Sequence, residues 1–183
     1  VYDRIDHTRQ TINALQKNFL AEQSSLFIFS DGPRNKGKLE AVTNVRDFIH
    51  TLDGFQSIEI AEQKKNIGLA KSVIKGVTEV IDRFGKAIIL EDDLITAPSF
   101  LYNMNEALKV YKNDQNIFSI TGYNHPPRLM EIPTEYQEDV YFCPRAHCWG
   151  WATWADRWNK TDWEVTDFQI LLQDKKKQKK YNY

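Results

Sequence analysis

The sequence predicts an α/β fold with a mostly parallel central sheet and helices on both of its faces. Two observations support this expectation. Segments with helical spacing of apolar residues alternate with short apolar strands as far as residue 122, a pattern typical of parallel sheets with right-handed crossovers. Two of these strands, Leu26–Phe29 and Ala87–Leu90, are continuous apolar runs, which suits strands that are covered on both faces.

Length and composition fit one ordinary globular domain. The chain has 183 residues, enough to bury a core, and 42% of them are hydrophobic and 27% charged. The net charge of −1 offers no basic field for nucleic acid, so we expect no nucleic-acid partner. No apolar run reaches the length of a membrane span. Cys143 and Cys148 are a poor zinc set, and we expect free thiols in a cytoplasmic protein.

Apolar spacing predicts the elements of the first two thirds. Val1-Tyr2 is interpreted as the end of a strand whose beginning precedes Val1, so we expect sequence to be missing there. The clearest helical period runs from Leu69 to Phe84, and Gly85 follows as a C-cap. The other expected elements are a helix from Asp6 (its N-cap) to Asn18, the strand Leu26–Phe29, a helix from Gly37 to Thr51, the strand Ser57–Ala61, a strand ending at Leu90, a helix from Pro98 to Tyr111, and the strand Ile117–Thr121 with Phe118 and Ile120 inward.

The pattern changes after residue 122. Tyr123–Asp139 contains three prolines and no period, which predicts a long loop. A short strand is expected at Val140–Cys143. An aromatic segment then leads into a short helix that ends near Trp158, and a last helix begins near Thr166.

The expected domain organisation follows from this change. Residues 1–122 are expected to form an α/β core, and residues 123–183 an irregular cap packed on the same domain. The lysines from Lys175 to Lys180 are expected on a solvated helix face. A peripheral contact with the inner face of a membrane is the alternative for these lysines.

Three consecutive acids follow the apolar run Ala87–Leu90. Glu91, Asp92 and Asp93 repel one another, and they are easiest to keep ionised beside a cation. Hard divalent metals prefer carboxylate oxygens, and open α/β sheets bind ligands just past the carboxyl ends of their strands. The triplet therefore predicts a metal site that holds phosphates. A solvated acidic turn is the ordinary alternative.

Other polar residues are expected at the same rim of the sheet. Arg4 follows the first strand and Asp31 the second, and Lys71 lies in the first turn of the helix that starts at Leu69. Each has a plain alternative, which is a surface ion pair, an Asp-Gly turn and a solvated lysine respectively. Their convergence with Asp92 and Asp93 is what favours a binding site.

Common phosphate and nucleophile motifs are absent from the sequence. There is no GxxxxGK[ST], no GxGxxG and no GxSxG pattern. A nucleotide would therefore have to be held by a metal and by side chains. The histidines are scattered, and His147 beside Trp149 is expected to be structural.

These residues, taken together, resemble a known family. The motifs are Tyr-Asp-Arg at residues 2–4, Ser-Asp-Gly at 30–32, Asn-Ile-Gly-Leu-Ala-Lys at 66–71, the run from Ile88 to Phe100, and Trp-Gly-Trp at 149–151. In this order they are similar to bacterial GT-A glycosyltransferases related to the N-acetylglucosaminyltransferase I type. The resemblance covers nearly the whole chain and implies a GT-A fold, in which residues 1–122 bind a nucleotide-sugar and residues 123–183 face the acceptor.

The resemblance also implies roles for the donor side. Glu91-Asp92-Asp93 matches the DXD-like motif, in which Asp93 would ligate Mn²⁺ or Mg²⁺ and Asp92 would approach the ribose or the sugar. Asp31 would contact uracil, and Arg4 the base or phosphate region. Ser72 stands near another base-side contact of the family.

For the acceptor side, Trp149-Gly150-Trp151 matches the Gly-Trp segment after which the family's acceptor region begins. In related enzymes the general base lies beyond that segment. The carboxylates that follow it here are Asp156, Asp162, Glu164, Asp167 and Asp174. None has a convincing context, so we expect the base to follow Tyr183.

The implied function is metal-dependent, inverting transfer of a sugar from a nucleotide-sugar, favoured as a UDP-sugar, to a glycan acceptor during synthesis of a bacterial surface polysaccharide. Two alternatives stay open. One is a sugar nucleotidyltransferase, although the glycine-rich loop of that class is not visible in the sequence. The other is a carbohydrate-binding module that uses the tryptophans between Trp149 and Trp158.

Overall fold

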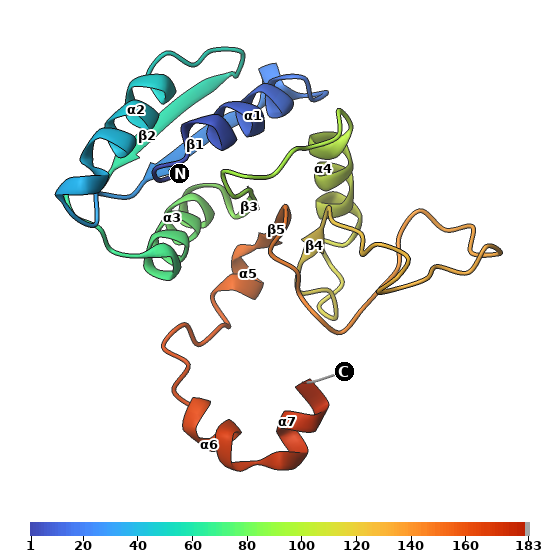
Figure 1. Ribbon diagram of the computed structural model, residues 1–183. Helices are drawn as coiled ribbons and strands as arrows, with labels where there is room; N and C mark the ends of the chain where they lie inside the picture. The colour runs from blue at the N-terminus through green and yellow to red at the C-terminus, as the bar shows by residue number, and fades with distance from the viewer. Residues whose placement is uncertain (182–183) are drawn as a thin grey trace.

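Two small sheets form the centre of the fold (Figure 1). The computed structural model describes residues 1–181 and is mixed α/β, as expected. Strands β1 and β2 pair in parallel, whereas the second sheet is antiparallel with the order β3-β5-β4. The strands are β1 (Ser25–Ser30), β2 (Ser57–Glu62), β3 (Lys86–Ile89), β4 (Ile120–Thr121) and β5 (Trp151–Trp154).

The helices lie close to their predicted positions. The helix α3 begins and ends at the predicted residues, and Gly85 caps it in the left-handed region with φ +73°. The first helix starts one residue earlier than predicted, with Arg4 and not Asp6 in front of it. The helices are α1 (Ile5–Gln16), η1 (Ala21–Gln23), η2 (Lys36–Lys38), α2 (Leu39–Ile49), α3 (Leu69–Phe84), α4 (Phe100–Val110), α5 (Ala155–Trp158), α6 (Phe168–Gln173) and α7 (Lys175–Tyr181).

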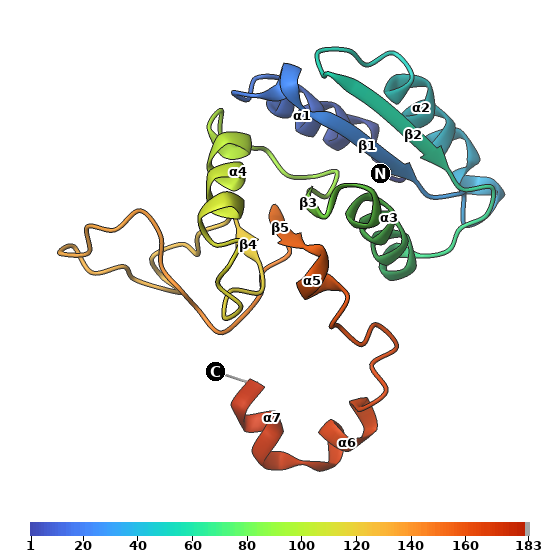
Figure 2. The same ribbon diagram turned by 180° about the vertical axis from the view of Figure 1, so that it is seen from behind.

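Helices cover both faces of the β1–β2 pair, as predicted (Figures 1 and 2). Ile28 packs with Val45 and Ile49 of α2 on one face. Phe29 faces α3 on the other face, where a Cβ added to Gly76 would lie 2.8 Å from its ring. Both faces of the apolar strand are therefore covered by helices. This explains why its sequence does not alternate between apolar and polar residues.

The antiparallel sheet is built around a strand that was not predicted. β5 lies between β3 and β4, with Ala87 opposite Thr153 and Thr121 opposite Trp151. Ala152 and Trp154 pack against α4, and Trp151 packs on the opposite face near α3 and α5. Because β4 precedes residue 122 and β5 follows it, the expected boundary between core and cap lies inside this sheet.

The expectation of one mostly parallel sheet is wrong for the part of the chain that the structure describes. β3 pairs with β5 in the antiparallel direction, and the two sheets are not hydrogen-bonded to each other. Val1 donates from its nitrogen to the Phe29 carbonyl at 2.8 Å and accepts from the Asp31 amide at 3.2 Å. This is the hydrogen-bond pattern of a parallel ladder, so Val1 lies beside β1 as a strand end should.

Three smaller expectations are also wrong. Val140–Cys143 forms no strand, because no other strand lies beside it to accept its backbone hydrogen bonds. The strand expected at Ile117–Thr121 contains only its last two residues, and Phe118 is exposed. The single helix expected after Thr166 is two helices, because the Asp174 carboxylate accepts from the amides at the start of α7 and caps it there.

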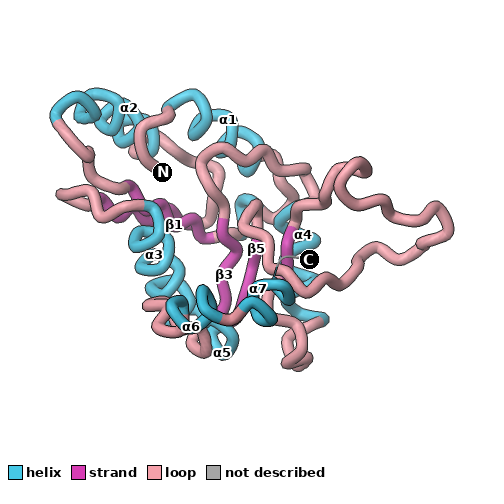
Figure 3. The backbone as a smooth tube through the Cα atoms, turned by 60° about the horizontal axis from the view of Figure 1, so that its bottom comes forward, coloured by secondary structure: helices cyan, strands magenta, loops and turns pink. Residues whose placement is uncertain are grey.

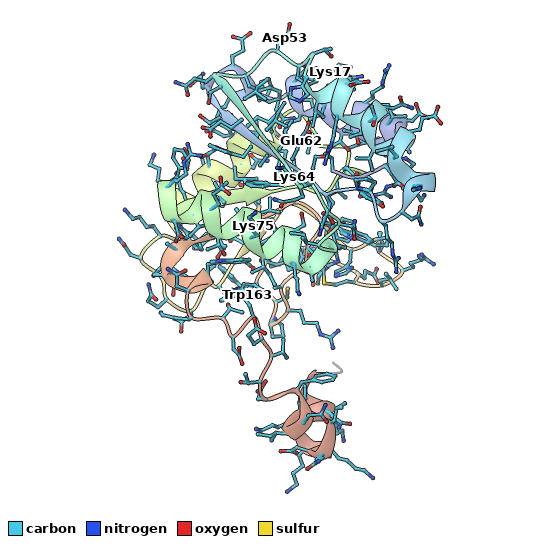
Figure 4. The ribbon with its side chains drawn as sticks, turned by 90° about the vertical axis from the view of Figure 1, so that its left-hand side faces the viewer. Lys17, Asp53, Glu62, Lys64, Lys75 and Trp163 are labelled. Atoms are coloured by element: carbon cyan, nitrogen blue, oxygen red, sulfur yellow. The ribbon has the colours of Figure 1, made fainter. Side chains whose placement is uncertain are left out.

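The segments after the sheets project from the rest of the molecule. The loop of residues 123–149 extends to one side of α4 (Figure 1). The helices α6 and α7 lie beyond Trp163, below the two sheets (Figure 4). Within residues 1–181, no helix combines the length and the apolar character needed to cross a membrane.

Candidate functional site

The acidic strand end is joined to the first residues of the chain. Arg4 forms ion pairs with Asp92 and with Asp93, the latter at 3.0 Å. The Tyr2 amide also donates to the Asp92 carboxylate at 3.3 Å. The structure therefore brings three predicted site residues together, with the arginine neutralising part of the acidic charge.

The three acids differ in their surroundings. The Asp92 side chain is 8% exposed and that of Asp93 35% exposed. Burial raises the pKa of Glu91, and repulsion from Asp93 and Asp92 raises it further. The nearby Cys148 side chain partly offsets this rise in the pKa of Glu91, so the aromatic segment reaches the acidic strand end.

Asp31, at the end of β1, organises the loop that leads into α3. Its buried carboxylate accepts from the amides of Gly32 at 2.8 Å, Ile67 at 3.0 Å and Gly68 at 3.0 Å. Gly32 is required beside it, because an added Cβ would lie 2.5 Å from the backbone of Lys65. The structure assigns no turn to Asp31-Gly32, and it places Asp31 beside the same cavity as the acids.

The two predicted residues at the start of α3, Lys71 and Ser72, differ in whether they line the cavity. The Ser72 amide makes a first hydrogen bond of this helix with the carbonyl of Gly68, at 3.0 Å. Ser72 lines the cavity described below, whereas Lys71 is exposed and does not line it.

A cavity of about 1000 Å³ lies between β1 and β3. Figure 3 shows β1, β3 and β5 following one another across the molecule in that order. The polar end of the cavity lies past the carboxyl ends of β1 and β3. The rest is lined by apolar side chains of α1, α3 and the two strands together with the polar residues Thr8, Thr11, Gln23, Ser24, Ser25 and Asn105. The residues that form the polar end are Asp31, Asn66, Ser72, Glu91 and Asp92. This is the place where open α/β sheets bind their ligands.

Four aromatic rings form a cluster at the base of the 123–149 loop. Trp149 is 45% exposed and its ring lies 4.6 Å from Tyr123 and 4.9 Å from His147. His125 lies 5.4 Å from Tyr123 and 5.2 Å from His147. Burial lowers the pKa of His147, and the charge of His125 lowers it further. Most of these rings meet edge to face, and only Tyr123 and His147 are stacked, so the exposed Trp149 ring is the one face of the cluster on which a sugar could stack.

Tyr123 and His125 were missed in the sequence. The structure brings them to Trp149 because the Gly122 amide donates to the Gly150 carbonyl at 2.7 Å. No local pattern predicts that pairing across the loop.

The two residues after Trp149 support the fold. Gly150 has φ +67°, and an added Cβ would lie 3.1 Å from the ring of Phe100. Trp151 belongs to β5 and its ring stacks on Trp158 at 6.0 Å. Of the predicted acceptor-side segment, Trp149 is the residue whose side chain belongs to the ring cluster.

The carboxylates considered as a general base are held elsewhere. Hydrogen bonds from Gln115 and Arg157 lower the pKa of Asp156, and those from Thr166 lower the pKa of Asp162. The cavity is lined by none of the five candidates, which are Asp156, Asp162, Glu164, Asp167 and Asp174. The expectation that the base follows Tyr183 lies outside the described residues.

The donor atoms at the acidic strand end suit a hard cation. Asp92 and Asp93 supply carboxylate oxygens, which Mn²⁺ and Mg²⁺ prefer, and Arg4 now pairs with one oxygen of each. Within residues 1–181 no group of three or more His, Cys, Asp or Glu side chains is arranged to hold a metal.

Comparisons with protein-family models, with characterised proteins and with solved structures found no match to this chain.

Proposed function

We propose that the polar end of the cavity binds a nucleotide-sugar and that this chain is the donor-binding core of a metal-dependent glycosyltransferase. The proposed reaction transfers a sugar, with inversion, from a UDP-sugar to a glycan acceptor in the synthesis of a bacterial surface polysaccharide. One observation carries the proposal: Asp31, Ser72 and the adjacent pair Glu91 and Asp92 come from three separate segments and line one end of one cavity, with Arg4 and Asp93 beside them.

The chemistry of these residues supports donor binding. Asp93 is the more exposed of the two paired acids and would hold Mn²⁺ or Mg²⁺, which offsets charge on the diphosphate leaving group. Arg4 would then exchange its carboxylate partners for phosphate oxygens, since its guanidinium binds both bidentately. Asp31 keeps the loop before α3 in place through its backbone hydrogen bonds.

Thermal unfolding with nucleotides tests this proposal. UDP, GDP and CDP are each added with and without Mn²⁺, and we expect one diphosphate to raise the unfolding temperature only when the metal is present. Asp93→Asn should abolish that gain. Asp82→Asn, an exposed acid on α3, is the matched control and should keep it. No gain with any pairing would exclude a donor site.

The ring cluster favours a second candidate, a carbohydrate-binding module without transfer activity. Its exposed Trp149, with His147 packed edge to face against it, forms a surface that needs neither metal nor nucleotide to bind a sugar. Glycan binding that is lost in Trp149→Ala and unaffected by UDP, Mn²⁺ or Asp93→Asn would favour this candidate. Binding that strengthens when nucleotide and metal are present would favour the transferase.

A further inference from the structure

We infer that Arg4 makes cation binding at the acidic strand end depend on the diphosphate. Arg4 competes with the cation for Asp92 and Asp93, and it is released when phosphate oxygens replace these partners. The inference rests on the proposed function and adds to it a competition between Arg4 and the cation. The cation and the diphosphate should therefore bind well together and only weakly alone.

The first observation is that the Arg4 guanidinium bridges the two acids through different nitrogens. Its Nη2 donates to Asp92 Oδ1, and its Nη1 donates to Asp93 Oδ2 at 3.0 Å. The second oxygen of Asp92 accepts from the Tyr2 amide at 3.3 Å. Three of the four oxygens of Asp92 and Asp93 are thus bound by residues 2–4, so a cation that binds both carboxylates has to displace Arg4.

The second observation is that the side chain of Arg4 is free to move while its backbone is fixed. The Arg4 carbonyl accepts from the Thr8 amide at 2.9 Å and from the Thr8 hydroxyl at 3.0 Å, and Thr8 is buried. The residue before it is held as well, because Asp3 pairs with Lys38 at 2.6 Å. The Arg4 side chain, in contrast, is 45% exposed, so its ion pairs with the acids are weak enough to exchange.

The third observation concerns what Asp92 keeps when Arg4 leaves. Its side chain is largely buried, and a buried carboxylate without a partner is costly. The Tyr2 amide still donates to it, and Tyr2 is fixed by its hydroxyl, which accepts from the Arg34 amide at 3.1 Å. Release of Arg4 is therefore unfavourable unless a cation replaces the positive charge beside Asp92.

A diphosphate offers Arg4 a second set of partners. A guanidinium binds phosphate oxygens with the same two-pronged geometry as it binds carboxylates. A diphosphate bound in the polar end of the cavity, which Asp92 lines, would draw Arg4 away from the acids and open them to the cation. Coupling between two ligands is reciprocal, so the cation should strengthen diphosphate binding by the same factor.

The substitution Arg4→Lys separates this competition from a general effect of charge. It keeps the positive charge, but one ammonium group lacks the two nitrogens that reach separate carboxylates. Asp93 should thereby be released, and Mn²⁺ alone should bind about fivefold more tightly. A preformed complex of Mn²⁺ with pyrophosphate should bind about fivefold more weakly, because the bidentate phosphate contact is lost. A purely structural defect would weaken both.

The experiment measures both affinities on the 183-residue chain. Electron paramagnetic resonance of the free ion follows binding of Mn²⁺ alone, and titration calorimetry follows binding of the pyrophosphate complex. The matched control is Arg9→Lys, the same exchange elsewhere on α1, where Arg9 lies 5.1 Å over the ring of Phe48. It should leave both affinities unchanged. A second variant, Arg4→Gln, removes the charge as well and should strengthen binding of Mn²⁺ alone at least as much as Arg4→Lys.

The inference is overturned if Arg4→Lys changes neither affinity or moves both in the same direction, or if Arg9→Lys has the same effect. Absence of Mn²⁺ binding in every variant, with and without pyrophosphate, would overturn it together with the proposed function. Opposite changes in Arg4→Lys without stabilisation by UDP, GDP or CDP would support the competition and exclude the nucleotide donor. Stabilisation by a nucleotide with Mn²⁺, but unchanged affinities in Arg4→Lys, would support the donor site and exclude the competition.

Discussion

The parallel pair β1–β2 and the antiparallel sheet β3–β5–β4 are stabilised by different kinds of side chains. Between β1–β2 and α2 the buried groups are aliphatic, namely Ile28, Val45 and Ile49. Around β5 the largest buried groups are Trp154 and Trp158. Stabilisation is thus spread over many small side chains in the first sheet and concentrated in a few large ones in the second.

The large side chains of the second sheet also act as hydrogen-bond donors between elements. The Trp158 indole donates to Thr78 of α3 at 2.9 Å, and the Trp154 indole donates to the Leu108 carbonyl of α4 at 3.1 Å. Each tryptophan therefore fixes a helix against β5 or α5 by a directional contact as well as by area. This difference teaches that a four-residue strand can be central to a fold when its neighbours are large enough to anchor it.

The largest expected effect comes from removing one of these anchors. Trp158→Ala should lower the free energy of unfolding by about 3–5 kcal/mol, because it leaves a cavity and an unpaired Thr78 hydroxyl. Val45→Ala in the first sheet removes two methyl groups and should cost about 2 kcal/mol or less. Urea unfolding of both variants measures the difference. Equal losses would mean that stabilisation is not concentrated in the second sheet.

Two arginines, one buried and one partly exposed, extend the comparison. Arg157 is 3% exposed, donates to the carbonyls of Lys112 at 2.8 Å and Asp114 at 3.0 Å, and lies over the Trp154 ring at 4.3 Å. Arg46 joins the ends of β1 and β2 by donating to the Ser30 hydroxyl and to two backbone carbonyls, with a side chain 20% exposed.

Arg157→Met should cost about 2–3 kcal/mol of unfolding free energy, since it removes the hydrogen bonds of a buried guanidinium and its contact with the Trp154 ring. Arg46→Met should cost about 1–2 kcal/mol, because water can reach the groups that it releases. The two variants retain similar side-chain length, so urea unfolding compares the lost hydrogen bonds. A larger loss of unfolding free energy for Arg46→Met than for Arg157→Met would contradict the expectation that the arginine beside the second sheet contributes more to stability.

The same contrast explains how much of the fold could be predicted. α3 was predicted to the residue because its apolar period repeats over four turns and a glycine ends it. β5 is too short for a period to show, and Trp151–Trp154 reads equally well as the entry to a helix. The antiparallel pairing of β3 with β5 joins residues more than sixty positions apart, and no local pattern specifies that choice.

The candidate site likewise contains residues that could be predicted and contacts that could not. Asp31 and Asp92 could be placed at strand ends because apolar runs precede them, and both do line one cavity. The convergence of Arg4 with Asp92 and Asp93 was predicted, whereas its direct ion pairs with both acids were not, since side-chain pairing between distant segments leaves no local pattern. The contact between Tyr123 and Trp149 depends in turn on the hydrogen bond between Gly122 and Gly150.

The two strand ends at the cavity should respond to mutation with opposite signs. Asp31 ends β1, and its carboxylate accepts backbone hydrogen bonds from Ile67 and Gly68. Asp31→Ala should lower the free energy of unfolding by about 1–2 kcal/mol, because those amides lose a charged acceptor. Hydrogen exchange at Ile67 and Gly68 should accelerate, whereas exchange in β5 should not. Unchanged exchange at both amides would contradict this role.

Glu91 lies just past the end of β3, where burial and the neighbouring acids Asp93 and Asp92 raise its pKa. A raised pKa means that folding disfavours the ionised carboxylate, so the protein loses stability as the pH rises from the ordinary carboxyl range through the raised pKa. Glu91→Gln should therefore increase the unfolding temperature near neutral pH, and this gain should vanish at acid pH, where Glu91 is protonated in both states.

The gain should stay below about 1 kcal/mol, because solvent screens this partly exposed group. Thermal unfolding of Glu91→Gln across the pH range checks it, with Glu22→Gln, an exposed acid on η1, as the matched control. Asp31 stabilises the end of β1 through backbone partners, whereas Glu91 at the end of β3 carries repulsion that a bound cation could relieve. If Glu91→Gln changed stability equally at every pH, or lowered it at neutral pH, then Glu91 would not destabilise the end of β3. The contrast with Asp31 at the end of β1 would then be wrong.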